Sequence, residues 1–182
     1  MKTVLVPLAD DCEEMEAITI TDILTRAGAK VTTAGLKEGP VRASRGARLL
    51  PDVVMSDVQD QTFDLIALPG GLPGADHLAQ DAILQDMIKR QNSKEAMLAA
   101  VCAAPKALAS AGVLSGRKIT SYPGSMDALT PDWSSNSGNK VEIDGHIVTG
   151  RGPGVALEFA LTLVENLFGA DKRAEVEAEL VL

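Results

Sequence analysis

Short apolar runs alternate with longer segments of helical periodicity along most of this chain of 182 residues. Strand-length runs that are each followed by a helix are typical of parallel β-α-β units. The runs predict strands over residues 3–8, 30–34, 64–68 and 95–101, and the periodic segments predict helices over residues 13–27, 75–91, 103–111, 155–168 and 171–179. This order predicts a single α/β domain over residues 1–182, built on a doubly wound, mostly parallel sheet.

The segments between these units predict smaller pieces of β-structure. Residues 41–54, rich in Arg, Gly and Pro, are expected to form a hairpin or small extra strands. Residues 118–121 are expected to form a short strand, and residues 123–139, rich in Pro, Ser and Asn, a loop. Residues 140–149 predict a hairpin that turns at Asp144-Gly145, because Asp-Gly is a favoured hairpin turn.

The composition argues against several classes of partner. The formal net charge is −8, so we expect neither a stable complex with nucleic acid nor binding to an anionic membrane. No apolar run is long enough to span a membrane or has the design of a signal peptide, so we expect a soluble, cytoplasmic protein. Two cysteines cannot form a disulfide framework, and no Cys/His cluster has zinc spacing, so we expect no metal site.

Cys102 is the first candidate for chemistry. It directly follows the apolar run 97–101 and precedes a predicted helix, which places it at the carboxyl edge of the sheet, where open α/β sheets bind ligands. The positive end of a helix dipole and its free N–H groups favour a thiolate, so we expect the pKa of this thiol to be lowered. The alternative is that Cys102 is a small buried apolar residue among alanines.

Glu16 is the second candidate, because it is a carboxylate in phase with apolar residues. The apolar face of the first predicted helix, expected to pack on the sheet, contains Ile20, Ile23, Leu24 and Ala27. Burial there would raise the pKa of Glu16, and a neutral carboxyl can donate a hydrogen bond to a thiolate or pass a proton to a substrate. The alternative is a solvated first-turn glutamate, which is our interpretation of Glu13 and Glu14.

Two turns and the second cysteine complete the candidates. Gly70 and Gly71 end the strand 64–68, and glycine lets a backbone N–H face the crevice, as an oxyanion site requires. The alternative is a plain loop. The turn at residues 150–154 fits neither the P-loop nor the dinucleotide fingerprint and is expected to shape the pocket. Cys12 is flanked by acidic residues that disfavour its thiolate, so we interpret it as structural.

Four of these segments occur in register along the chain: Glu13-Glu14-Met15-Glu16, Leu68-Pro69-Gly70-Gly71, Ala100-Val101-Cys102-Ala103-Ala104-Pro105 and Arg151-Gly152-Pro153-Gly154. Together they resemble the DJ/ThiJ/PfpI superfamily, and within it the branch of the parkinsonism-associated protein deglycase and its bacterial relatives. The match extends over nearly the whole chain, and four motifs in order are far more specific than any one of them. The resemblance implies a flavodoxin-like three-layer sandwich with an added small β-hairpin, assembled as a homodimer.

The resemblance also implies the roles of individual residues. Cys102 would be the nucleophile and Glu16 its protonated partner and proton shuttle, while the N–H groups of Gly71 and Ala103 would form the oxyanion site. The substrate pocket would contain Glu13, Arg45, Gly70, Tyr122, Gly152 and Pro153. No cofactor is implied.

The function implied is that of a cofactor-independent glyoxalase or deglycase. Its substrates would be small 2-oxoaldehydes such as methylglyoxal and glyoxal, or their early adducts on proteins or nucleotides. The alternative is an oxidative-stress redox sensor or chaperone that acts through reversible oxidation of Cys102. Two departures bear on the activity. Tyr122 stands where many relatives carry His, which predicts slower turnover or reliance on Glu16 alone. Ala103 stands where the peptidase-like branch has His, which argues against a cysteine peptidase.

Overall fold

The computed structural model describes residues 1–182 and contains a seven-stranded sheet in the order β10-β11-β7-β6-β1-β2-β5. Its strands are β1 (Thr3–Leu8), β2 (Lys30–Gly35), β5 (Val53–Val54), β6 (Leu65–Leu68), β7 (Met97–Val101), β10 (Val141–Asp144) and β11 (Ile147–Gly150). All neighbouring strands pair in parallel except β10, which pairs antiparallel with β11. The predicted doubly wound, mostly parallel sheet is therefore confirmed.

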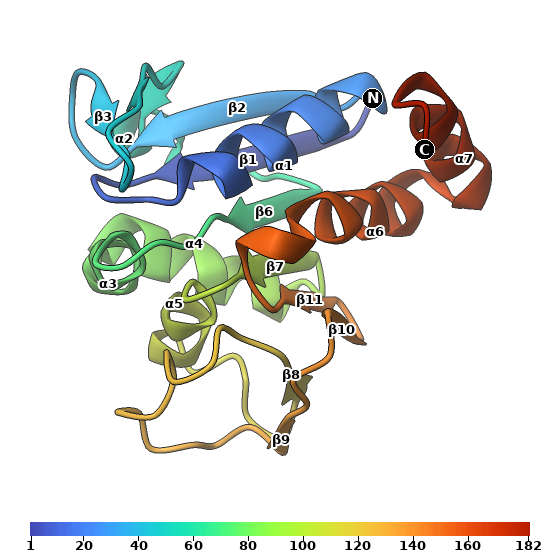
Figure 1. Cartoon of the computed structure of the whole chain (residues 1–182). Helices are drawn as coiled ribbons and strands as arrows, with labels where there is room; N and C mark the ends of the chain where they lie inside the picture. The colour runs from blue at the N-terminus through green and yellow to red at the C-terminus, as the bar shows by residue number, and fades with distance from the viewer.

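Helices cover both faces of this sheet, so the molecule has three layers (Figure 1). One face packs against α1 (Glu14–Arg26) and α6 (Ala156–Phe168), and α7 (Ala170–Glu179) packs against α6. The other face packs against α2 (Met55–Val58), α3 (Gly74–Gln80), α4 (Ala82–Ser93) and α5 (Pro105–Ser110). Because both faces are covered, β6 is buried along its whole length, as is usual in a parallel sheet.

The smaller β-structure agrees with the predictions in part. The segment 41–54 forms a two-stranded hairpin from β3 (Val41–Arg42) and β4 (Arg48–Leu49), while β5 joins the main sheet. The hairpin predicted over residues 140–149 is present as β10 and β11. The segment 123–139 was predicted to be a loop but contains β9 (Ser135–Asn136), which pairs with β8 (Lys118–Ile119). A two-residue strand of Ser and Asn has no apolar alternation, so its sequence gives no strand signal.

The helix after Cys102 begins later than predicted. Residues 102–104 form a turn, and α5 starts at Pro105 rather than at Ala103. The reason is the hydrogen bonding of this stretch: the N–H groups of Ala104 and Lys106 donate to the carbonyls three residues earlier, at 3.0 and 3.1 Å, so they close tight turns rather than α-helical turns. Pro105 then occupies the first turn of α5, where its missing N–H is tolerated.

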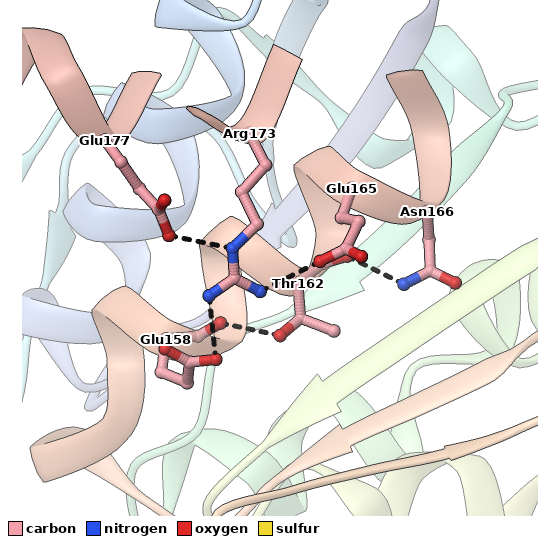
Figure 2. Close-up of polar contacts among 6 residues, drawn as sticks. All are labelled: Glu158, Thr162, Glu165, Asn166, Arg173 and Glu177. Atoms are coloured by element: carbon pink, nitrogen blue, oxygen red, sulfur yellow. Dashed lines mark hydrogen bonds and ion pairs between the residues drawn. The ribbon is translucent and has the colours of Figure 1, made fainter. Parts of the chain in front are cut away.

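Arg173 fastens α7 onto α6 (Figure 2). Its guanidinium forms ion pairs with Glu158 and Glu165 of α6, both at 3.0 Å, and with Glu177 of α7 at 2.8 Å. These hydrogen bonds, with that to Glu177 foremost, raise the pKa of Arg173. Glu158 and Glu165, two polar residues of the largely apolar α6, are therefore the points at which Arg173 holds α7 against α6. No helix in the structure combines the length and apolar character needed to cross a bilayer.

Candidate functional site

Cys102 lies at the carboxyl end of β7 in a strained backbone conformation. A positive φ at a residue other than glycine costs about 1 to 3 kcal/mol and persists only where surrounding structure enforces it. Here the Cys102 N–H donates a hydrogen bond to the Gly150 carbonyl at 2.9 Å, and the Tyr122 N–H donates to the Cys102 carbonyl at 2.8 Å. The segments that contain Gly150 and Tyr122 therefore hold the turn that carries the thiol.

Glu16 is completely buried in the first turn of α1, as its position among apolar residues predicts. Its Oε2 accepts a hydrogen bond from the Gly70 N–H at 2.7 Å, while its buried Oε1 has no hydrogen-bond partner. Burial raises the pKa of Glu16 to about 7, against the opposing effects of the Gly70 N–H and the Cys102 thiol. The predicted rise in this pKa is confirmed, and the free Oε1 is available to take up or release a proton.

Gly70 lies against both the carboxyl and the thiol, and only glycine fits there. A Cβ atom at Gly70 would lie 2.6 Å from Cys102 Cβ and 2.8 Å from Glu16 Oε2. The adjoining Gly71 has a φ of 101°, and a Cβ there would lie 2.4 Å from the Asp11 carbonyl oxygen. The two glycines thus allow the backbone to pass close to Glu16, Cys102 and the Asp11 turn.

The N–H groups of Gly71 and Ala103 face the Cys102 sulfur and lower its pKa. Burial and the neighbouring Glu16 carboxylate outweigh them and raise the pKa of Cys102 to about 12. The prediction of a lowered thiol pKa is therefore wrong, because the thiol is poorly solvated and lies beside an acid. The two groups titrate as a pair, and above about pH 7 the pair holds one proton.

A cavity of about 310 Å³ opens above the thiol. It brings together six of the predicted site residues: Glu13, Arg45, Gly71, Cys102, Tyr122 and Pro153. Of the other four, Gly152 lines an adjoining cavity of about 340 Å³ that shares Tyr122 and Pro153, while Glu16, Gly70 and Ala103 are buried. No group of three or more His, Cys, Asp or Glu side chains is arranged to hold a metal ion.

The cavity wall contains three further residues that were not predicted from the sequence: Asp11, Ser44 and Leu72. Asp11 directly follows the first strand region, and its place at the carboxyl edge could have marked it. Ser44 belongs to the β3–β4 hairpin, which contacts the site because the Ser44 N–H donates to the Cys12 carbonyl at 2.8 Å. Leu72 lies between the two glycines and α3. Neither Ser44 nor Leu72 has a local sequence signal, because tertiary contacts place their loops.

Cys12 is the second thiol near this cavity but does not reach it. Its side chain is completely buried. Burial, reinforced by the charge of Glu14, raises the pKa of Cys12 to about 12. The predicted suppression of its thiolate is confirmed.

The chain is similar to known proteins over its whole length. The model of the DJ-1/PfpI family matches residues 2–166. Protein DJ-1 homolog A of Arabidopsis thaliana is 44% identical over 183 residues; the match covers 100% of this chain and spans only 47% of that protein. Glutathione-independent glyoxalase DJR-1.2 of Caenorhabditis elegans is 37% identical over 90% of this chain and 87% of its own length.

A solved structure gives the same result for the fold. The crystal structure of DJ-1beta from Drosophila melanogaster is 43% identical, superimposes with a TM-score of 0.95, and covers 100% of this chain and 98% of that one. Cys102 and the buried carboxyl of Glu16 therefore lie in a chain whose fold and sequence both match one family: this chain belongs to the DJ-1/PfpI family.

Proposed function

We propose that this protein is a cofactor-independent glyoxalase or deglycase that converts 2-oxoaldehydes, or their early adducts, into hydroxy acids. The observation that carries the proposal is the buried Glu16 carboxyl, with one unpaired oxygen, packed beside the cavity-facing thiol of Cys102. The name of the Caenorhabditis elegans relative, a glutathione-independent glyoxalase, supports it.

The first step is addition of the thiol to the aldehyde carbon. The Glu16 carboxylate takes the thiol proton as Cys102 Sγ forms a bond to carbon, and the carbonyl π pair moves to oxygen. The N–H groups of Gly71 and Ala103, which face the sulfur, are placed to donate hydrogen bonds to the new oxyanion. The product of this step is a hemithioacetal, and Glu16 is left protonated.

The second step moves hydrogen between adjacent carbons. Glu16 protonates the oxyanion, then removes the proton from the former aldehyde carbon to leave an enediolate and returns that proton to the neighbouring carbon. The hydroxyl proton of the former aldehyde oxygen passes to the neighbouring oxygen as the thioester carbonyl forms. The former aldehyde carbon is oxidised as its neighbour is reduced, so no external oxidant is needed. The resulting thioester of a 2-hydroxy acid is hydrolysed by one water, which regenerates the thiol. With an early adduct, Cys102 Sγ forms its bond to carbon as the C–N bond breaks, and the amine leaves with the proton that Glu16 took from the thiol; the same hemithioacetal results.

The direct test is formation of lactate from methylglyoxal. Cys102→Ser should remove all of it and Glu16→Gln most of it, while Cys12→Ala serves as the matched control and should retain activity. Full activity in Cys102→Ser would exclude the proposal.

The second candidate function is redox sensing coupled to chaperone activity, and the contrast between the two thiols favours it. Cys102 faces a cavity, whereas Cys12 is sealed in the core. A peroxide would oxidise the Cys102 thiol to a sulfenic acid and be reduced to water. Intact-mass spectrometry after mild peroxide should therefore show one oxygen on Cys102 before any on Cys12. Equal oxidation of both thiols would count against this function.

The homodimer stays a prediction. Met15 and Ile18 of α1 are more than half exposed, which leaves apolar surface that a second copy would cover. Sedimentation velocity measures the state directly: a dimer is expected, and a monomer at micromolar concentration would contradict it.

A further inference from the structure

We propose that the ion pair between Asp76 and Lys106 is a positioning device that fixes the spacing of the two N–H groups facing the Cys102 sulfur. The inference rests on the proposed function, in which those N–H groups stabilise the thiolate and the oxyanion. It adds two residues that do not line the cavity. They act through the backbone rather than by touching a substrate.

The first half of the device connects Gly71 to Asp76. Gly71 lines the cavity together with Cys102, and its N–H lowers the pKa of that thiol. Its carbonyl accepts a hydrogen bond at 2.9 Å from the N–H of Ala75, in the first turn of α3. Asp76 is the next residue. A movement of Asp76 is therefore transmitted to the Gly71 peptide through one hydrogen bond and a short stretch of backbone.

The second half connects Ala103 to Lys106 in the same way. Ala103 directly follows Cys102, and its N–H also lowers the pKa of that thiol. The Ala103 carbonyl accepts a hydrogen bond from the Lys106 N–H at 3.1 Å. Lys106 is the second residue of α5, a helix of only six residues. So short a helix has little stability of its own, and it follows the strained turn at Cys102. Its position must be fixed by contacts with other elements.

The ion pair joins the two halves into a closed ring. Lys106 Nζ donates to Asp76 Oδ1, and α3 and α5 lie against each other at the same end of the sheet (Figure 1). The Lys106 side chain is only 17% exposed and that of Asp76 is 38% exposed, so the Lys106 end of the pair is largely shielded from water. The ring runs from the sulfur through Gly71 and α3 to the ion pair, and returns through α5 and Ala103.

The test separates positioning from simple charge and from activity. The readout independent of glyoxalase activity is the rate of iodoacetamide alkylation of Cys102 at neutral pH in a Cys12→Ala background. Lys106→Met and Asp76→Asn should each slow alkylation about tenfold and lower kcat for methylglyoxal by a similar factor, with KM changed less than about twofold. This estimate is below the roughly hundredfold effect of removing an oxyanion donor outright, because here the donors are loosened rather than lost.

The decisive variant exchanges the charges, Asp76→Lys with Lys106→Asp. Positioning predicts that the exchange restores alkylation and kcat to within about threefold of the wild type, because the ion pair is re-formed. A direct effect of the Lys106 charge on the thiol predicts a rate slower than in either single variant, and that result would overturn the proposal. Unchanged rates in both single variants would overturn it too.

Controls keep the outcome readable if a variant is unstable. Lys118→Met breaks the Lys118–Glu142 ion pair, which lies outside the cavity, and should leave alkylation unchanged. Lys106→Arg keeps the charge and should keep the rate. Circular dichroism identifies any variant that is unfolded. If the wild type makes no lactate, the proposed function fails, and the alkylation arm still decides the positioning role.

Discussion

The buried carboxyl of Glu16 should make the stability of this protein fall as the pH rises through neutrality. Its pKa is about 7 in the folded chain and 4.5 as the ordinary value for the unfolded chain. Between these values the folded state holds a proton that the unfolded state has released, so the free energy of unfolding decreases with pH. The stabilisation is complete below about pH 4.5 and lost above about pH 7. The difference between the two pKa values is worth about 3 kcal/mol.

The perturbation that isolates this effect is Glu16→Gln. Glutamine has nearly the same shape, can still accept the hydrogen bond from the Gly70 N–H, and stays neutral at every pH. The free energy of unfolding should be measured by urea titration of both proteins between about pH 5 and pH 8. Over that range the wild type should lose about 2 to 3 kcal/mol relative to Glu16→Gln. Other pH-dependent groups are common to both proteins and largely cancel in the difference.

Glu142→Gln is the matched control. Glu142 should not make stability fall over this pH range, because its pKa is lowered rather than raised. Hydrogen bonds from Ser137, Asn139 and Lys118 outweigh the effect of burial on this pKa. Glu142 is therefore ionised in both folded and unfolded chains across this range, and its difference curve should be flat. A flat curve for Glu16→Gln as well would mean that water reaches the Glu16 carboxyl in the folded protein. That result would refute the assignment of Glu16 as the buried proton carrier.

Three further outcomes are expected. The kcat/KM for methylglyoxal should rise with pH through about 7 and then level off, because the reactive form of the Glu16–Cys102 pair holds one proton. A kcat/KM that falls over this range would contradict the role of the Glu16 carboxylate as the base. Gly70→Ala should lower lactate formation at least about a hundredfold, because the new Cβ would lie 2.6 Å from Cys102 Cβ. The control Gly116→Ala, at an exposed turn, should keep the activity per folded molecule. Arg173→Met removes three ion pairs and should lower the free energy of unfolding by about 1 to 2 kcal/mol, and by less in high salt. The control Lys172→Met removes one ion pair and should change this free energy by less than about 0.5 kcal/mol. Equal effects of the two substitutions in urea titrations would contradict the special role of Arg173.

Much of the fold and the centre of the site can be predicted from local sequence. The alternation of apolar runs and periodic segments is a property of the chain itself, and it sets the layers of the sandwich. The phase of Glu16 with Ile20 and Leu24 likewise predicts that it is buried and that its pKa is raised. Both predictions use only the geometry of a single element.

Features that depend on several elements could not be predicted in this way. The sign of the pKa change at Cys102 depends on its distance from Glu16 and from water, which the tertiary structure sets. The positive φ of Cys102, in the turn before α5, depends on hydrogen bonds to Gly150 and Tyr122 that hold it there. Ser44 reaches the cavity only because its hairpin packs on the loop of Cys12. Each of these contacts joins residues far apart in sequence.

The contrast between the two cysteines gives the protein a built-in reporter of its own opening. Cys12 has no exposed surface, and its backbone lies against Gly71 and Gly74 at the edge of the site. An intact molecule should thus take up one alkyl group, at Cys102, and an unfolded one should take up two. The second mass increment reports alkylation of Cys12. Its rate then measures how often the structure around Cys12 opens in native conditions. Pulse alkylation followed by mass spectrometry would yield that opening free energy without any introduced probe.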